Sequence, residues 1–442
     1  MRRRTTFHLL LGNNLIANIT NFTVWFALTF WVFLETRSVF ATGMVAGIYL
    51  GLTASLGIWF GSLVDHHSKR SGMMASSFAS FIAYAASLAF YASQPEQRFA
   101  DVSGVHLWLF ILMLMVGIIA GNIRTIALPT IVTALIAEAD RDKANGLVGM
   151  TTGVGFLTTS AISGFLLAWG GMEATLLVAL GLTLLAFAHL LFVRFDEPRP
   201  DGHADTPRRV DLAGTIRVVA GVPGLFALIF FASFNNFLGG VFMALMDAYG
   251  LSLMKVQEWG LLWAFVSCAL ILSGIVISRT GLGKNPLRTL LTVNLIMWSV
   301  AAVFTIQSSI LLLAAGCTIW MFLGPFAEAA EHTTLQKVVP YDRQGRVFGF
   351  AQSVEQAASP LTAFLIAPLA QFVFIPLMTD GAGADAIGDW FGRGPERGIA
   401  LVFTVAGALG VLMTIAAFNS SYYRRLSAAY RSGPETAVAA EA

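Results

Sequence analysis

Charged side chains within long apolar stretches are the residues of this chain best placed to do chemistry. Five carboxylates lie in or near such stretches: Glu35, Asp247, Glu328, Glu331 and Glu355. Glu328 stands four residues before His332, so both lie on one helix face and could share a proton. We expect proton coupling at Glu328, then Glu355, then Asp247. For Glu35 and Asp247, at the ends of their segments, an interfacial position is the alternative.

Polar side chains in the middle of a membrane are costly, so their presence suggests a purpose. Asn14, Asn18 and Asn21 recur at helical spacing with Trp25 next along the same face, and two asparagines occupy a matching segment of the second half. Arg124 is the one basic residue well inside an apolar segment. The substrate cavity is expected to include Asn14, Asn18, Asn21, Trp25, Arg124, Asn235 and Asn236. Hydrogen bonding between helices is the alternative for the asparagines, and snorkelling to the interface is the alternative for the arginine.

The composition indicates whether the segments that carry these residues contact water or lipid. Of 442 residues, 12% are charged and 56% are hydrophobic. A soluble chain of this length carries about twice that share of charges on its surface. Lipid must therefore contact much of this protein's surface, and we expect a polytopic membrane protein.

A bilayer core requires about 20 mostly apolar residues per helical crossing. That length predicts twelve transmembrane helices, at 8–34, 40–64, 71–92, 106–135, 145–168, 173–194, 223–248, 257–279, 287–306, 309–331, 346–376 and 398–419. Runs this long and continuously apolar lack the alternation of barrel strands. The fold class expected is all-α, integral to the membrane.

The distribution of Lys and Arg predicts the orientation. The sequence has 27 Lys and Arg residues. If the N-terminus lies in the cytoplasm, the loops on the opposite side of the membrane contain only five of them: Arg37, Arg98, Lys255, Arg393 and Arg397. Such an asymmetry follows the positive-inside rule. We expect a multi-pass protein of the bacterial cytoplasmic (inner) membrane with both termini in the cytoplasm.

A polar stretch rich in proline divides the helices into six and six. The expected domains are an N-terminal bundle over 1–194, a cytoplasmic linker over 195–221, and a C-terminal bundle with a short cytoplasmic tail over 222–442. Local matches between the halves, such as Asp142-Lys143 through Gly149 and Asp342-Arg343 through Gly349, indicate an internal repeat. Many transporters are built from two such pseudo-symmetric bundles.

The loop after the second predicted helix reads Gly61-x-x-x-Asp65-x-x-x-Lys69-Arg70, and that after the tenth reads Gln336-Lys337 through Gly349. The first resembles the signature loop of the major facilitator superfamily, with His66 in place of the usual basic residue and Ser68 in place of a glycine. The second resembles the drug:proton antiporter branch that includes macrolide and siderophore exporters. The resemblance implies a twelve-helix fold and transport by alternating access.

A conformational latch is also implied, made of Gly61, Asp65, Lys69, Arg70 and Arg346 and closed when the cytoplasmic side is closed. Asp65 is expected to face the positive N-terminal end of the helix that begins near Arg346. A solvated loop carboxylate is the alternative.

The function expected is proton-coupled efflux of a moderately large amphiphilic compound. Solute uptake by symport is the alternative, because the antiporter signature is degenerate: the fifth predicted helix lacks a Gly-Pro pair, and Met113 stands where the common arginine would fall. A membrane enzyme or sensor is the third reading, and we expect no enzyme since no catalytic or nucleotide-binding motif is found. We expect no cofactor, metal or nucleic-acid partner, a monomer, and a proton gradient as the energy source.

Overall fold

The computed structural model describes residues 2–36, 39–193 and 211–432, and these ranges are helical almost throughout, with no strand in any of them. The linker expected over 195–221 lies outside the described residues as far as residue 210. The chain forms two compact units, residues 1–218 with 339–353 and residues 219–338 with 354–442. The first unit thus takes in a short segment from late in the sequence.

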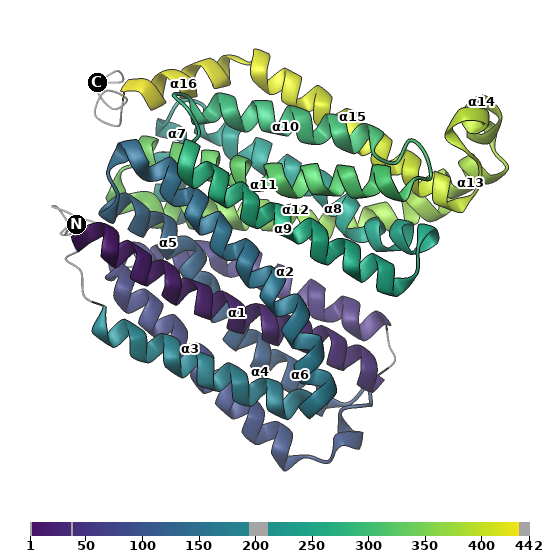
Figure 1. Ribbon diagram of the computed structural model, residues 1–442. Helices are drawn as coiled ribbons and strands as arrows, with labels where there is room; N and C mark the ends of the chain where they lie inside the picture. Colours follow the sequence, from purple (N-terminus) through teal and green to yellow (C-terminus); the bar gives the residue numbers. More distant parts are fainter. Residues whose placement is uncertain (1, 37–38, 194–210, 433–442) are drawn as a thin grey trace. The chain divides into compact units, whose positions relative to one another are not determined.

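The first unit consists of helices that run back and forth (Figure 1). They are α1 (Arg2–Thr36), α2 (Val39–His66), α3 (Lys69–Ser93), α4 (Val105–Ala120), α5 (Asn122–Leu135), α6 (Arg141–Phe192), most of α7 (Leu212–Gly221) and the first turns of α12 (Gln344–Leu369). The longest packing seam joins α1 to α6, and α3 lies against α4, α5 and α6. Ser68 caps α3, because its side chain accepts a hydrogen bond from the Ser71 N–H at 3.0 Å.

One expected segment is interrupted by a backbone feature that was not predicted, and one expected boundary coincides with another. The segment expected over 106–135 is α4 and α5, which meet at Gly121, where the Asn21 side chain occupies the space a Cβ would need. The segments expected over 145–168 and 173–194 are both within α6, which passes through Gly171 at a φ of +64°. Glycine is the residue that tolerates this left-handed conformation.

The second unit packs its helices around aromatic side chains. It contains α8 (Leu225–Leu253), α9 (Val256–Thr280), α10 (Pro286–Val303), α11 (Ile310–Val338), the rest of α12, a π-helical turn (Ala370–Phe374), α13 (Ile375–Thr379), α14 (Ala382–Phe391), α15 (Pro395–Asn419) and α16 (Ser421–Ser432). α10 packs against both α11 and α15 (Figure 1). Phe242 stacks on Phe403 at 4.8 Å between ring centroids, and Trp298 meets Trp320 at 4.9 Å.

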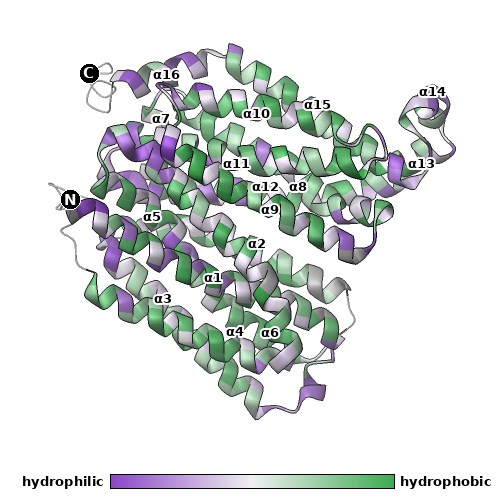
Figure 2. Ribbon diagram, viewed as in Figure 1, coloured by the Kyte–Doolittle hydropathy of each residue, from purple (hydrophilic) through white to green (hydrophobic). Residues whose placement is uncertain are grey.

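Ten helices in the described residues are long and apolar enough to cross a membrane. They match ten of the twelve expected segments; the other two are the first part of α6, rich in Gly and Thr, and α12, which carries Gln, Ser and Glu. Figure 2 shows hydrophobic residues along the helices and hydrophilic ones gathered towards their ends. Large apolar side chains such as Phe165, Phe192, Phe230 and Leu311 are exposed, as expected of a lipid-facing surface.

Candidate transport site

The carboxylate of Asp65 binds the first turn of α12. Its Oδ1 accepts a hydrogen bond from the Gly345 N–H at 2.7 Å, and its Oδ2 accepts one from the Arg346 N–H at 2.8 Å. The Arg346 Nε lies 3.8 Å from the same Oδ2, and both side chains are buried. The first N–H groups of a helix have no partner within the helix, so a carboxylate satisfies them and interacts favourably with the positive end of the helix dipole.

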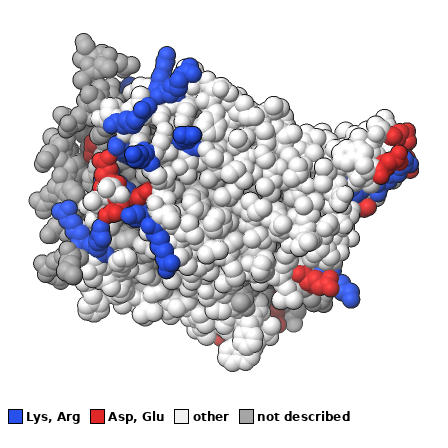
Figure 3. Space-filling model, turned by 45° about the horizontal axis from the view of Figure 1, so that its top comes forward, with Lys and Arg blue, Asp and Glu red and all other residues white. Residues whose placement is uncertain are grey.

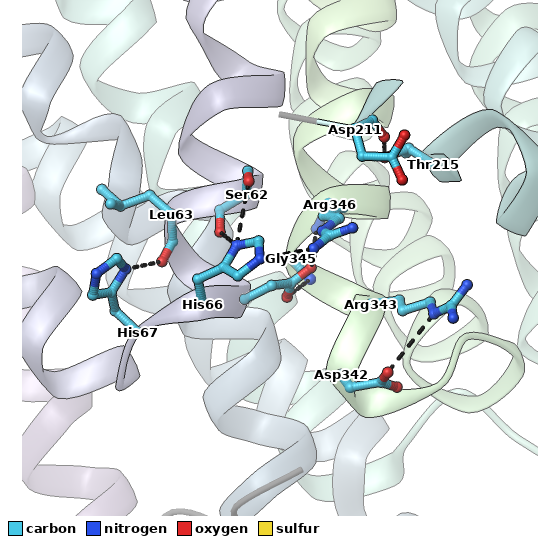
Figure 4. A network of polar contacts seen from close by, with 11 residues as sticks. Ser62, Leu63, His66, His67, Asp211, Thr215, Asp342, Arg343, Gly345 and Arg346 are labelled. Atoms are coloured by element: carbon cyan, nitrogen blue, oxygen red, sulfur yellow. Dashed lines mark hydrogen bonds and ion pairs between the residues drawn. The ribbon is translucent and has the colours of Figure 1, made fainter. Parts of the chain in front are cut away.

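His66 adds a second contact to this helix end (Figure 4). Its Nδ1 lies 2.7 Å from the Ser62 carbonyl oxygen, which can only accept, so Nδ1 carries the proton. The Nε2 is then an acceptor, and it lies 3.0 Å from Nη2 of Arg346. A histidine thus holds the Arg346 guanidinium at the place where the family pattern has a basic residue.

Close packing of small residues brings α2 and the start of α12 together. A Cβ on Gly61 would collide with the Gly345 carbonyl oxygen, and one on Gly57 would collide with the Ser353 hydroxyl. A Cβ on Gly349 would in turn meet the Gly57 carbonyl. These glycines let the two backbones approach at the distance that the Asp65 hydrogen bonds require.

Two further members of the expected latch lie in different surroundings. Lys69 is buried, close enough to Asp65 for electrostatic attraction, with its Nζ 4.9 Å from the centre of the Tyr341 ring. Arg70 instead donates to the carbonyl oxygens of Leu190 at 3.0 Å and Leu191 at 3.2 Å, at the end of α6. The structure therefore brings Gly61, Asp65, Lys69 and Arg346 together and places Arg70 at a helix C-terminus.

Arg124 is fully enclosed within the first unit. It donates to Asn13 Oδ1 at 2.7 Å, to the Ser77 hydroxyl at 2.5 Å and to the Met73 carbonyl at 3.3 Å. Asn13 in turn donates to the Ala186 carbonyl at 2.8 Å. This network of neutral partners ties α5 to α1, α3 and α6, and no carboxylate within the described residues forms an ion pair with the guanidinium.

Two of the expected cavity residues of the first unit line a small pocket, whereas Asn14, Asn18 and Trp25 are not among its lining residues. Asn21 and Arg124 both line it, together with Thr20, Ser76, Ser77 and Ser80. Asn21 accepts from the Tyr84 hydroxyl at 3.1 Å. Asn14 is buried, and Asn18 is half-buried next to Gly155. Trp25, also half-buried, lies 4.5 Å from the Tyr49 ring, measured between centroids.

In the second unit, the expected cavity residues of α8 are half-buried. Asn235 accepts from Trp298 Nε1 at 2.5 Å and donates to the Phe231 carbonyl, so it borders the aromatic cluster. Asn236 donates to the Ala232 carbonyl at 3.2 Å. Asp247 is exposed and accepts from Trp259 Nε1 at 2.9 Å, which places it at the end of α8 and away from the other expected coupling residues.

Two carboxyl groups of the second unit meet between spans. The side chains of Glu331 on α11 and Glu355 on α12 are within hydrogen-bond reach of each other, and both are half-buried. Glu328, one turn before Glu331 and itself exposed, interacts electrostatically with both. Two carboxyl groups in contact can share one proton, because a protonated carboxyl group donates a hydrogen bond that a carboxylate accepts. Within the described part of the chain, Glu355 Oε1 is buried with no hydrogen-bond partner.

Sequence reasoning did not select three residues that the structure places at these centres. Asn13 rather than Asn14 holds Arg124, and Glu331 rather than Glu328 bonds to Glu355. Arg397, expected in a loop, is buried at the start of α15 and donates to the Thr305 and Ile306 carbonyls at 3.0 and 2.8 Å. Asn13 and Glu331 could have been considered from the sequence, because each lies close to a selected residue of the same type, Asn14 and Glu328.

The sequence matches the pattern of a known family. The sequence pattern of the Major Facilitator Superfamily matches residues 10–363. No curated protein matches the sequence.

Three solved structures share the fold. A bacterial homologue of the iron transporter ferroportin, in an outward-facing state, has a TM-score of 0.68 at 14% identity over 93% of this chain and 98% of its own. The E. coli fucose:proton symporter has a TM-score of 0.66 at 13% identity, over 93% of this chain and 99% of its own. The proton:xylose symporter has a TM-score of 0.64 at 12% identity, over 94% of this chain and 96% of its own. Because the family pattern matches most of the chain and the fold matches that of solved transporters, the chain is a transporter that belongs to the Major Facilitator Superfamily.

Proposed function

We propose that this transporter exports a moderately large amphiphilic organic compound in exchange for protons. The observation that carries the proton-coupled part is the Glu331–Glu355 pair. A pair of carboxyl groups that retains one proton can release it when the surroundings of either group change, as they do during alternating access.

The pair modifies the expected assignment. Glu355 replaces Glu328 as the first candidate for the proton carrier, with Glu331 as its partner, and Glu328 acts on both through its charge. His332, four residues from Glu328, offers a route for the proton along α11. Asp247 lies apart from this group, so we assign it no direct part in proton transfer.

Export of an amphiphile is supported by two features. The loop from Gln336 to Gly349 resembles that of drug:proton antiporters. The second unit offers aromatic surface for an apolar ligand beside a polar group, at Trp298, Trp320 and Asn235. The substrate-facing set proposed is Asn14, Asn18, Asn21, Trp25, Arg124, Asn235 and Asn236. Uptake by symport stays the alternative, because two similarly folded proteins are named as proton symporters.

The proposal includes the surroundings of the protein. We place it as a monomer in the bacterial cytoplasmic membrane, with both termini in the cytoplasm and no cofactor other than the proton gradient. We further propose that the bundle over 1–194 and that over 222–442 alternate about the substrate, and that the Asp65 latch stabilises the state closed to the cytoplasm.

Proteoliposomes test the proposal. Purified protein is reconstituted with an imposed pH gradient, and the flux of a panel of fluorescent amphiphiles and of labelled sugars is followed. We expect an amphiphile to accumulate against its gradient on the acidic side, and Glu355→Gln and Glu331→Gln to abolish this movement. The matched control is Glu173→Gln, an exposed glutamate of α6. Sugar uptake along the proton gradient would favour symport, and unchanged flux in both glutamine variants would refute the coupling assignment.

A further inference from the structure

The helix α16 at the end of the described chain packs one face on the second unit. Leu426, Ser427 and Ala429 are buried against the ends of α8, α11 and α15. Tyr430 receives the Lys337 ammonium over its ring at 4.6 Å. A Cβ on Gly224 would collide with the Tyr422 carbonyl, so the start of α8 is shaped to accept α16. The helix is therefore held in a defined orientation.

The loop between α9 and α10 is bonded to this helix. Asn285 donates through Nδ2 to the Ser427 hydroxyl at 2.8 Å, and its Oδ1 lies 3.3 Å from the Arg288 N–H at the start of α10. This bond brings two groups of cations to one end of the second unit. They form what we call the α16 basic surface: Arg279, Lys284, Arg288, Arg424, Arg425 and Arg431.

Among the described residues, no carboxylate is paired with the α16 basic surface. All six side chains are exposed, and none is in an ion pair within the described ranges. The sequence has no Asp or Glu from Trp259 to Ala327 or from Gly398 to Ser432. Figure 3 shows Lys and Arg, with Asp and Glu beside some of them, gathered at one end of the spans next to white surface. A surface of one sign that lacks internal partners attracts an anionic one.

The position of the α16 basic surface at the ends of apolar spans indicates that its anionic ligand is a lipid. Arg279 lies in the last turn of α9, Arg288 in the first turn of α10, and α16 follows directly on α15. Arg279, Arg288 and the arginines of α16 each lie next to the end of an apolar span. We therefore expect their charges at the level of the lipid headgroups. Exposed Tyr422 is an aromatic residue of the type that favours this interface. Clusters of four to eight cations next to a membrane helix characteristically bind anionic lipid.

We propose that the α16 basic surface binds the anionic headgroups of membrane phospholipids. The buried face of α16 fixes the arginines in place, and the lipid phosphates then complete a site that the protein leaves positively charged. Lipid bound there links α16 to the ends of α8, α10, α11 and α15, and so steadies the second unit.

Lipid binding to the full-length protein in detergent tests the proposal. Native mass spectrometry counts bound phosphatidylglycerol and phosphatidylcholine, and a melting curve records stabilisation by each. We expect selective binding of phosphatidylglycerol, weakened at least about tenfold in the triple variant Arg424→Gln, Arg425→Gln, Arg431→Gln, since each cation contributes roughly fivefold. The lysine triple variant at the same positions should retain binding, which separates charge from folding.

The matched control removes three exposed arginines elsewhere, Arg4→Gln, Arg98→Gln and Arg393→Gln, and should bind phosphatidylglycerol like the parent protein. Equal binding by the parent and the α16 glutamine variant would overturn the proposal. So would stabilisation by inorganic phosphate, an acidic peptide or an oligonucleotide that matches or exceeds stabilisation by phosphatidylglycerol, because the surface would then serve a soluble anion or partner.

Discussion

The hydrogen bonds of Asp65 allow a quantitative prediction for the substitution Asp65→Asn. The carboxylate accepts from two backbone N–H groups at 2.7 and 2.8 Å in the first turn of α12. A hydrogen bond to a charged group contributes about 1.5–3 kcal/mol, and a neutral one about 0.5–1.5 kcal/mol. Asparagine keeps one acceptor oxygen and loses the charge, so the substitution should destabilise this contact by about 2–4 kcal/mol.

The assay is hydrogen–deuterium exchange at the backbone amides of Gly345 and Arg346. These amides lie too early in α12 to bond within the helix, so their protection depends on Asp65. A loss of 2–4 kcal/mol in the free energy of opening corresponds to exchange about 30 to 1000 times faster. Amides in the middle of α12 should be much less affected.

The matched control is Asp342→Asn, which alters an aspartate of the preceding turn whose side chain is paired with Arg343 at 3.7 Å. It should leave exchange at Gly345 and Arg346 close to that of the parent protein. If Asp65→Asn accelerates exchange less than about threefold, equivalent to roughly 0.7 kcal/mol, the carboxylate does not hold the helix end and the latch proposal fails.

Three other substitutions test the packing around the candidate sites. Gly61→Ala should destabilise the protein by about 1–3 kcal/mol through overpacking and so lower its melting temperature, whereas Gly47→Ala, with open space at its Cβ, should not; equal effects would contradict the close approach. Asn13→Ala removes an acceptor from the enclosed guanidinium of Arg124 and should cost about 1–3 kcal/mol in a denaturant or thermal unfolding measurement; an unchanged midpoint would show that the cation is satisfied by other groups. Arg397→Gln leaves the carbonyl oxygens of Thr305 and Ile306 without their donor and should destabilise the second unit by about 2–4 kcal/mol, seen as faster exchange in α10 and α15; retained protection would show that these bonds do not hold the two helices.

The spans could be predicted from sequence because the bilayer imposes a length on them. Ten of the expected segments fall on helices that are long and apolar enough to cross, and even the junction near residue 170 coincides with the turn at Gly171. The short amphipathic helices α14 and α16 escaped prediction, since a search for about 20 apolar residues passes over them. α16 packs on the ends of α8, α11 and α15, and α14 packs on α13, so contacts rather than apolar length stabilise them.

The site could be predicted only to within a helical turn. Asp65 and Arg346 were expected to meet, and the structure brings them together because a carboxylate and a helix N-terminus attract wherever they are placed. Asn13 and Asn14 differ by 100° around α1, and Glu328 and Glu331 by one turn of α11. Which asparagine faces Arg124 depends on the rotation of α1, and which glutamate lies level with Glu355 depends on the position of α11 along its axis. The sequence specifies neither.

Infrared difference spectroscopy of the purified transporter between acidic and alkaline buffers tests the central claim most directly. A carboxyl group that binds a proton gains a C=O stretching band distinct from that of a carboxylate. If Glu331 and Glu355 share a proton, the parent protein should show a band that shifts in Glu331→Gln and disappears in Glu355→Gln, but is kept in Glu173→Gln. Spectra that are identical in the parent and in both pair variants would contradict the account.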